Sequence, residues 1–216
     1  MRAMILAAGR GERLRPLTDR TPKPLLEAGG KPLIAGVIER LRAAGVTDLV
    51  VNLGWLGGQI RDRLGDGSAL GVSIAYSDEG EDVLETAGGI VKALPLLGPD
   101  PFWVVNADVA TDFPFAGPPL AAGDRAHFVL VPSPAHVPGG DFGLADGRVV
   151  ASGGTRLTYS GIGVYRPEFF AGERPVRRPL LPLMQRAVAA GRVSGERYDG
   201  RWIDVGTAER LASITA

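Results

Sequence analysis

Residues 3–26 read AMILAAGRGERLRPLTDRTPKPLL, and this stretch decides the fold. Its apolar run ends at Gly9, which predicts a buried parallel strand that leads into a glycine-containing loop. The whole chain carries 24 Lys and Arg against 24 Asp and Glu, so the excess of cations in this loop is local. It predicts a small anionic ligand rather than a polyanion. The cations are Arg10, Arg13, Arg15, Arg20 and Lys23.

The loop after Gly9 matches neither of two common phosphate-binding templates. The Walker pattern GxxxxGK[ST] is absent, and Leu14 stands where a dinucleotide-binding fingerprint has its third glycine. Glycine nevertheless lets the backbone approach a ligand, and the N–H groups of such a loop form a concave anion site. We therefore expect an anion to bind these N–H groups together with Arg13 and Lys23.

Prolines interrupt the same loop and predict that it is extended and stiff, which fixes its cations in space. These prolines are Pro16, Pro22, Pro24 and Pro32. A lysine is rare in this arginine-rich chain, so its presence at position 23 indicates a compact point charge. Arg10 and Arg20 are interpreted as solvated surface charges.

Length and composition limit the class of protein. The 216 residues are enough for one sizeable core, so we expect a single domain. The chain has no cysteine, which excludes a disulfide framework, a thiolate zinc site and a cysteine nucleophile. The apolar start is too short for a signal-peptide core or for the ~20 residues of a membrane span. We expect a cytoplasmic protein that is a monomer and does not bind membranes.

Strand and helix patterns alternate in the first half of the chain. Further strands are predicted at 49–53, 72–76 and 102–105, and helices at 56–64, at 87–94 and from Pro32 to a stop at Gly45. In the second half, strands are predicted at 126–132, 142–144, 148–151 and 158–165, and a helix at 179–190. The sequence predicts an α/β fold: a Rossmann-like, predominantly parallel but mixed sheet sandwiched by helices, with a small β-rich subdomain.

Two aspartates are candidate metal ligands. Asp108 follows the apolar strand FWVVN, at the edge where the first and fourth strands of a doubly wound sheet are neighbours. That position is opposite the glycine loop, where an acid beside cations and phosphates is most useful as a ligand of Mg²⁺. Asp204 in RWIDVGT is a candidate second ligand, and its spacing equally supports a cap for a helix that begins near Thr207.

An ordered set of motifs over nearly the whole chain resembles the sugar nucleotidyltransferases. The motifs are residues 6–26, LETAGGI, VVNADV, GDFGL, TYSGIGVYRPEFF and RWIDVGT. Members of this family join a sugar 1-phosphate to a nucleoside triphosphate and release pyrophosphate. The short length and the segment LGDGSALGVSIAYSDEGEDVLETAGGI are most similar to bacterial enzymes that use UTP and N-acetylmuramate 1-phosphate in peptidoglycan recycling.

The resemblance implies a role for each matching position, with about 1–115 binding the nucleotide and about 116–216 the sugar. The catalytic residues are Arg13, Lys23, Asp108 and Asp204, and the last two hold Mg²⁺. The nucleotide-binding residues are Ala8, Gly9, Gly11, Glu85, Thr86 and Gly88. The residues that bind the sugar 1-phosphate are Asn106, Asp141, Gly143, Ser160 and Gly161.

Some positions depart from the wider family pattern. Glu12 replaces a threonine and Glu85 a glycine, which disfavours mannose-1-phosphate guanylyltransferase, the alternative within the family. The lysine that clamps the sugar phosphate in many relatives is missing after Lys92, and Arg156 is a candidate substitute. A nucleotide-binding regulator without turnover stays open as another alternative. Zero net charge and the lack of an aromatic, basic platform argue against nucleic-acid binding.

Overall fold

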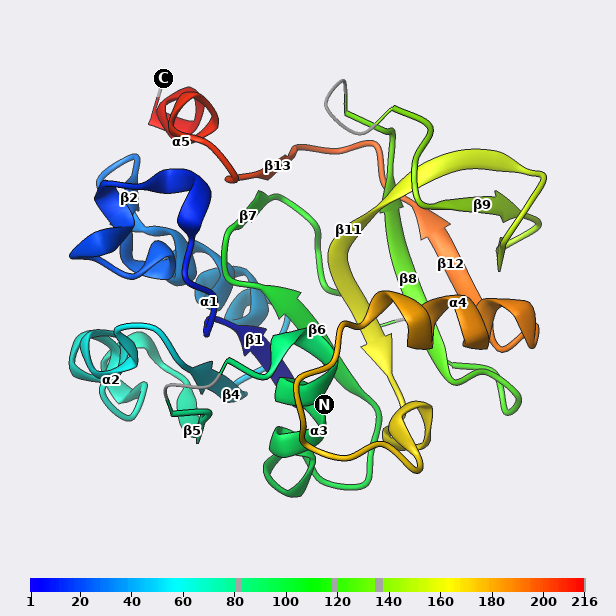
Figure 1. The fold of residues 1–216 in the computed structure, drawn as a ribbon, viewed down its shortest axis with the longest axis horizontal. Helices are drawn as coiled ribbons and strands as arrows, with labels where there is room; N and C mark the ends of the chain where they lie inside the picture. The colour runs from blue at the N-terminus through cyan, green and yellow to red at the C-terminus, as the bar shows by residue number, and fades with distance from the viewer. Residues whose placement is uncertain (81–82, 118–119, 135–137, 216) are drawn as a thin grey trace.

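The computed structural model describes residues 1–80, 83–117, 120–134 and 138–215. A nine-stranded sheet has the order β5-β4-β1-β6-β11-β8-β12-β10-β9 (Figure 1). The first four of these strands are parallel to one another. They are β1 (Ala3–Leu6), β4 (Asp48–Leu53), β5 (Ser73–Asp78) and β6 (Phe102–Asn106). The prediction that the first and fourth strands are neighbours is confirmed, because β1 pairs with β6.

The second half of the chain extends the same sheet. Its strands are β8 (Ala126–Val131), β9 (Phe142–Ala145), β10 (Arg148–Val150), β11 (Thr155–Tyr165) and β12 (Val193–Arg197). In Figure 1, β11 lies between β6 and β8, and it is antiparallel to both. β12, in turn, is parallel to β8. The sheet therefore contains both parallel and antiparallel pairs, so it is mixed, as the sequence predicts.

Helices cover both faces of the sheet. α1 (Leu33–Ala43) and α2 (Gly57–Leu64) contribute to one apolar core, and α3 (Glu85–Leu97) and α4 (Leu181–Ala189) to the other. Apolar residues at helical spacing explain α1, since Ile34, Ile38 and Leu41 are all buried. Pro32 immediately precedes α1, and Gly45 follows its end with a left-handed φ of 78°. None of the described helices is both long and apolar enough to cross a membrane.

The glycine loop is not extended, so that prediction is wrong. Three short 3-10 helices occupy it: η1 (Glu12–Leu14), η2 (Leu17–Asp19) and η3 (Lys23–Leu25). The fixed φ of proline suits such turns as well as extended chain, so prolines alone do not distinguish the two. A short hairpin of β2 (Glu27–Ala28) and β3 (Lys31–Pro32) then leads into α1.

The remaining short elements are β7 (Val109–Thr111), β13 (Trp202–Asp204), η4 (Ser68–Leu70), η5 (Pro167–Phe170) and α5 (Ala208–Thr215). β13 pairs with β7 in a small antiparallel ladder apart from the main sheet. This ladder brings the end of the chain back to the carboxyl edge of β6. At the top of Figure 1, α5 lies beside β2 and the glycine loop.

Candidate active site

A cleft of about 1070 Å³ lies at the carboxyl ends of β1 and β6. Its walls come from the glycine loop, from the start of α3 and from the segment between η5 and α4. Ligands of doubly wound sheets bind at this kind of edge, where the strand order reverses. The lining residues used below are Gly9, Arg10, Gly11, Glu12, Arg13, Lys23, Glu85, Asp108, Val176, Arg177 and Gly206.

The glycine loop presents its backbone to this cleft. Gly11 has a left-handed φ of 64°, and a β-carbon placed there would lie 2.8 Å from the Cγ2 atom of Thr18, so glycine is required. Gly9 is exposed, and a β-carbon on it would have no neighbour within 4 Å, which leaves its backbone open to a ligand. Ala8 is buried below the loop, where its carbonyl oxygen accepts a hydrogen bond from the N–H of Trp55 (3.3 Å).

Lys23 and Asp108 form an ion pair inside the cleft. Their side chains are 13% and 20% exposed, so neither is a solvated surface charge. Lys23 begins η3 and Asp108 follows β6, so two segments 85 residues apart in sequence place opposite charges together. The sequence prediction that Asp108 faces the glycine loop is confirmed.

Arg10 is exposed, as expected of a solvated charge. It also lines the cleft, and its guanidinium carbon lies 5.2 Å from the ring centroid of Trp55. This is a cation–π contact, which orients the guanidinium beside the loop. Trp55 is fixed in turn by a hydrogen bond from its Nε1 to the carbonyl oxygen of Thr18 (2.9 Å). The sequence signal was a tryptophan directly after a strand, which alone does not identify its partner.

Asp204 reaches the same edge through the β7–β13 ladder. It lies opposite Val109, and the N–H of the next residue, Val205, donates to the carbonyl oxygen of Asp108 (3.0 Å). The carboxylate of Asp204 accepts from the Nη1 of Arg210 (3.1 Å) and lines an adjoining cavity of about 330 Å³. The backbones of the two aspartates are therefore neighbours, whereas their carboxylates pair with different cations.

The alternative interpretation of Asp204 as a helix cap is wrong. α5 begins at Ala208, and the Oγ1 of Thr207 accepts a hydrogen bond from the N–H of Arg210 (3.4 Å). Thr207 therefore caps α5, because its hydroxyl accepts from an N–H of the first turn. Asp204 is the last residue of β13, so its carboxylate does not cap α5.

The two aspartates offer the donor chemistry of a magnesium site. Carboxylate oxygens are the ligands that Mg²⁺ takes. Asp108 lines the cleft and Asp204 lines the cavity of about 330 Å³, and both side chains are partly exposed. Among the residues that the structure describes, no group of three or more His, Asp or Glu side chains is arranged to hold a metal ion. Two protein carboxylates suit an ion that also binds substrate phosphates and water.

The start of α3 forms another wall of the cleft. Glu85 has an unusual positive φ of 58°, and its carboxylate accepts from the Nε of Arg177 (2.8 Å). Thr86 follows it on the first turn and is partly exposed. Gly88 lies below the segment that precedes α4, because a β-carbon there would collide with the carbonyl oxygen of Val176. Gly88 therefore permits close packing of two chain segments.

Among the predicted sugar-binding residues, Asn106 and Gly161 lie in contact. A β-carbon on Gly161 would lie 2.5 Å from the Nδ2 atom of Asn106, and Gly161 has a φ of 78°. Gly161 lies in β11, where the pairing register with β8 shifts between Tyr159 and Ile162. At this irregular point of the strand, Gly161 lies against Asn106 at the end of β6, so the two predicted residues are in contact.

The other predicted sugar-binding residues hold the β-rich half together. The Oγ of Ser160 is buried and donates to the carbonyl oxygen of Val129 (2.7 Å). Asp141 is exposed, and its Oδ2 accepts from the N–H of Tyr159 (2.8 Å). Gly143 is buried in β9, where a β-carbon would collide with the carbonyl oxygen of Gly153.

Arg156, the candidate substitute for the missing lysine, is exposed and donates to backbone carbonyls. Its Nε and Nη2 bond the carbonyl oxygens of Gly139 (3.0 Å) and Gly140 (2.9 Å). The guanidinium thus supports the turn that precedes Asp141.

Comparison with known proteins agrees with this geometry. The nucleotidyl transferase family model matches residues 2–129. The N-acetylmuramate alpha-1-phosphate uridylyltransferase of Neisseria meningitidis serogroup B is 53% identical over 100% of this chain and 97% of that protein. The protein of the same name from Caulobacter vibrioides is 38% identical over 94% of this chain and 91% of its own length. A putative glucose-1-phosphate thymidylyltransferase from Bacillus anthracis has a similar fold (TM-score 0.86, 21% identity, 100% and 94% coverage).

Proposed function

Because this chain belongs to the nucleotidyl transferase family, we propose that it transfers a uridylyl group from UTP to N-acetylmuramate 1-phosphate and releases pyrophosphate. The observation that carries the proposal is the joint placement of the glycine loop, Lys23 and Asp108 in one cleft. The choice of base and sugar is supported by 53% identity along the whole chain to a protein of that activity.

The proposed reaction is an in-line displacement. An oxygen of the sugar 1-phosphate attacks the α-phosphorus of UTP, and the bond from that phosphorus to the pyrophosphate oxygen breaks. No general base is needed, since the attacking phosphate is already ionised at neutral pH. Catalysis then consists of orienting two anions and neutralising their repulsion.

The cleft residues take distinct parts in this scheme. The N–H groups near Gly9 and Gly11 bind the triphosphate, Arg13 neutralises the pyrophosphate leaving group, and Lys23 contacts the reacting phosphates. Asp108 and Asp204 would hold Mg²⁺, which when bound neutralises charge on the phosphates.

The two ligands would occupy different parts of the site. Glu85 and the first turn of α3 face the nucleoside, whereas Asn106 and Gly161 lie where the sugar enters. We place this reaction in peptidoglycan recycling in the cytoplasm, performed by a monomer that folds as one domain.

The test is magnesium-dependent pyrophosphate release from UTP, with four sugar 1-phosphates compared in parallel. These are the esters of N-acetylmuramate, N-acetylglucosamine, glucose and mannose, with GTP and dTTP as competing nucleotides. Release with UTP and the muramate ester alone supports the proposal. Preference for mannose 1-phosphate with GTP would replace the proposed substrates, and UTP binding without turnover of any pair would favour a regulator.

A further inference from the structure

A second arginine, Arg210 of α5, lines the cavity of about 330 Å³ that Asp204 also lines, and its guanidinium approaches Gly206 in the cleft wall. A β-carbon placed on Gly206 would lie 2.5 Å from the Nη2 of Arg210 and 3.0 Å from the Nη1 of Arg13. Gly206 and Arg13 both line the cleft, so the two guanidinium groups approach one point on its wall. A β-carbon at position 206 would require the end of at least one of these arginine side chains to shift.

This arrangement holds two like charges close together. Two neighbouring cations repel each other unless an anion lies beside them. Asp204 supplies one negative charge through its bond to the Nη1 of Arg210 (3.1 Å). A guanidinium carries five N–H donors in a planar fork that matches the oxygens of phosphates. The pair of arginines thus has the charge and the geometry to bind a multiply charged anion.

Packing fixes the two chain segments that carry the arginines. Leu14, the residue after Arg13, shares an apolar cluster with Val205 and with Leu211 and Ile214 of α5. The cluster joins the glycine loop to α5, so the backbone positions from which the two side chains extend are set before a ligand arrives. Such preorganisation reduces the entropy that binding must overcome.

We propose that Arg13 and Arg210 form a two-arginine clamp for pyrophosphate, with Gly206 between them. The inference rests on the proposed function, in which pyrophosphate is the product that leaves from the Arg13 side of the cleft. Gly206 borders the same cleft as the glycine loop and Lys23, which identifies this wall with the anionic end of the ligand. Arg210 is a binding residue that neither motif nor spacing marks in the sequence.

The test is calorimetric binding of inorganic pyrophosphate with Mg²⁺ to the full chain in the absence of sugar. We expect Arg210→Gln to raise the dissociation constant by about 10- to 100-fold, and Arg210→Lys to restore part of the loss. The double variant with Arg13→Gln should lose less than the product of the two single effects, since both residues hold one anion. Arg186→Gln is the matched control, because it removes a 2.8 Å pair with Glu173 on α4.

Other outcomes overturn the clamp. Unchanged pyrophosphate binding in Arg210→Gln would contradict the clamp. A KM of Arg210→Gln that rises for N-acetylmuramate 1-phosphate but not for N-acetylglucosamine 1-phosphate would also contradict it. The second result would assign Arg210 to the carboxylate of the sugar. If Arg210→Gln does not fold, Arg210→Lys decides the question, and wild-type affinity in it would also count against the clamp. Pyrophosphate binding that depends on Arg210 without turnover of any sugar would keep the clamp and reject the proposed function.

Discussion

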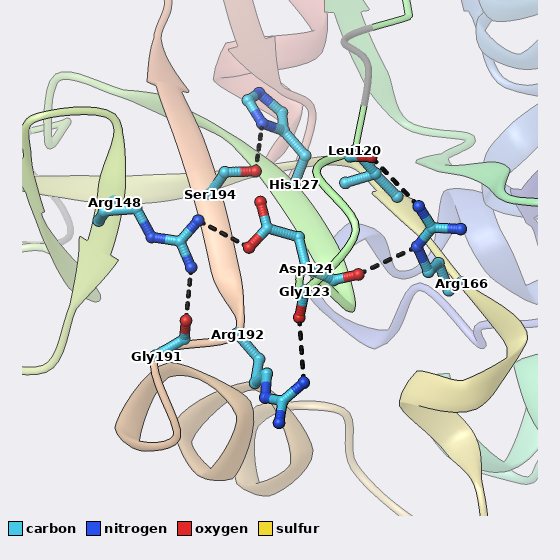
Figure 2. A network of polar contacts seen from close by, with 9 residues as sticks. All are labelled: Leu120, Gly123, Asp124, His127, Arg148, Arg166, Gly191, Arg192 and Ser194. Carbon is cyan, nitrogen blue, oxygen red and sulfur yellow. Dashed lines mark hydrogen bonds and ion pairs between the residues drawn. The ribbon is translucent and has the colours of Figure 1, made fainter.

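Two clusters of charged residues, at opposite ends of the central strands, use their hydrogen bonds differently. Just before the first residues of β8 and β12, Asp124 pairs with Arg148 (2.7 Å) (Figure 2). The other Nη of Arg148 donates to the carbonyl oxygen of Gly191 (2.5 Å). Arg166 bonds the carbonyl oxygens of Asp124 (3.0 Å) and Leu120 (3.2 Å). These guanidinium groups bind the chain itself and close loops of the fold.

In the cleft, by contrast, Lys23 and Asp108 bond each other beside a volume of about 1070 Å³. Arg10 and Arg13 also border that volume. The difference shows how to separate structural from ligand-binding charges: the first contact the backbone, and the second border a cavity. Substitutions in the two clusters should therefore affect different properties.

The largest expected effect is in the cleft. Asp108→Asn should lower kcat by about 10²- to 10³-fold, because in the proposed function it removes a negative charge that would hold Mg²⁺ near the reacting phosphates. The free energy of unfolding should change by less than about 1 kcal/mol, since the amide oxygen of asparagine can still accept a hydrogen bond from Lys23. Steady-state kinetics and urea unfolding measure the two quantities. A large loss of stability with unchanged kcat would place Asp108 with the structural cluster.

The opposite cluster should show the reverse pattern. Asp124→Ala removes a carboxylate that is 6% exposed and leaves Arg148 without its partner, so the free energy of unfolding should fall by about 3 kcal/mol. The kcat of the folded fraction should equal that of the wild type. Arg197→Gln, which removes an exposed pair with Asp199, is the control for loss of an arginine on the same half. A drop in kcat at full folding would contradict the division between the clusters.

A smaller effect concerns two tyrosines in the β-rich half. Tyr159 and Tyr165 share a hydrogen bond between their hydroxyl oxygens (3.0 Å), and burial raises the pKa of both above the ordinary value of 10.0. The unfolded chain releases these protons from about pH 10 upward while the folded chain keeps them. This contribution to stability is therefore complete below pH 10 and is lost as the pH rises further.

Replacing both tyrosines by phenylalanine removes both hydroxyl groups at once, so no hydroxyl remains that has lost its hydrogen-bond partner. The loss of unfolding free energy between pH 9 and pH 11 should be about 2 to 3 kcal/mol smaller in the double variant than in the wild type. Urea unfolding at the two pH values measures the difference. Tyr198→Phe is a useful comparison, because burial and a hydrogen bond to Asp112 raise the pKa of Tyr198 to about 12. An identical alkaline loss in the double variant and the wild type would disprove the assignment.

Much of the fold was predictable because apolar periodicity is local information. The strand before Gly9 and the helix after Pro32 follow from residues near each other in sequence. The adjacency of the first and fourth strands follows from the topology of a doubly wound sheet. Lys23 and Asp108 were also predictable, since topology brings the ends of neighbouring strands together. The family resemblance added Asp204, for which spacing alone left two interpretations.

The rest depends on contacts between distant segments. Gly88 was assigned to the nucleotide, yet its lack of a side chain also admits the carbonyl oxygen of Val176, far along the chain. The contact of the exposed Arg10 with Trp55 could not be predicted, because Trp55 follows a different strand. Arg210 had no motif, since its approach to Gly206 depends on how α5 packs against the loop. Sequence pattern identifies elements better than it identifies which side chains meet.

The smallest predicted effect tests whether Ser160 belongs with the structural residues. Its buried hydroxyl donates to the carbonyl oxygen of Val129 (2.7 Å) and accepts from the N–H of Ile162 (3.2 Å). Both of these bonds are made to the chain, as in the Asp124 cluster, although Ser160 precedes Gly161 at the proposed sugar site. Ser160→Ala should therefore lower the free energy of unfolding by about 1 kcal/mol and change the KM for the sugar 1-phosphate by less than about twofold.

Asn106→Ala is the matched comparison for Ser160, because Asn106 borders the same glycine from the end of β6. It should raise that KM by about tenfold, as expected when an amide that hydrogen-bonds the sugar is removed. If Ser160→Ala raises the KM as much while stability is unchanged, the hydroxyl leaves Val129 to bind the ligand. In that case a polar group that bonds the backbone would also bind the ligand. Contact with the backbone would then no longer separate structural groups from ligand-binding groups at the sugar site.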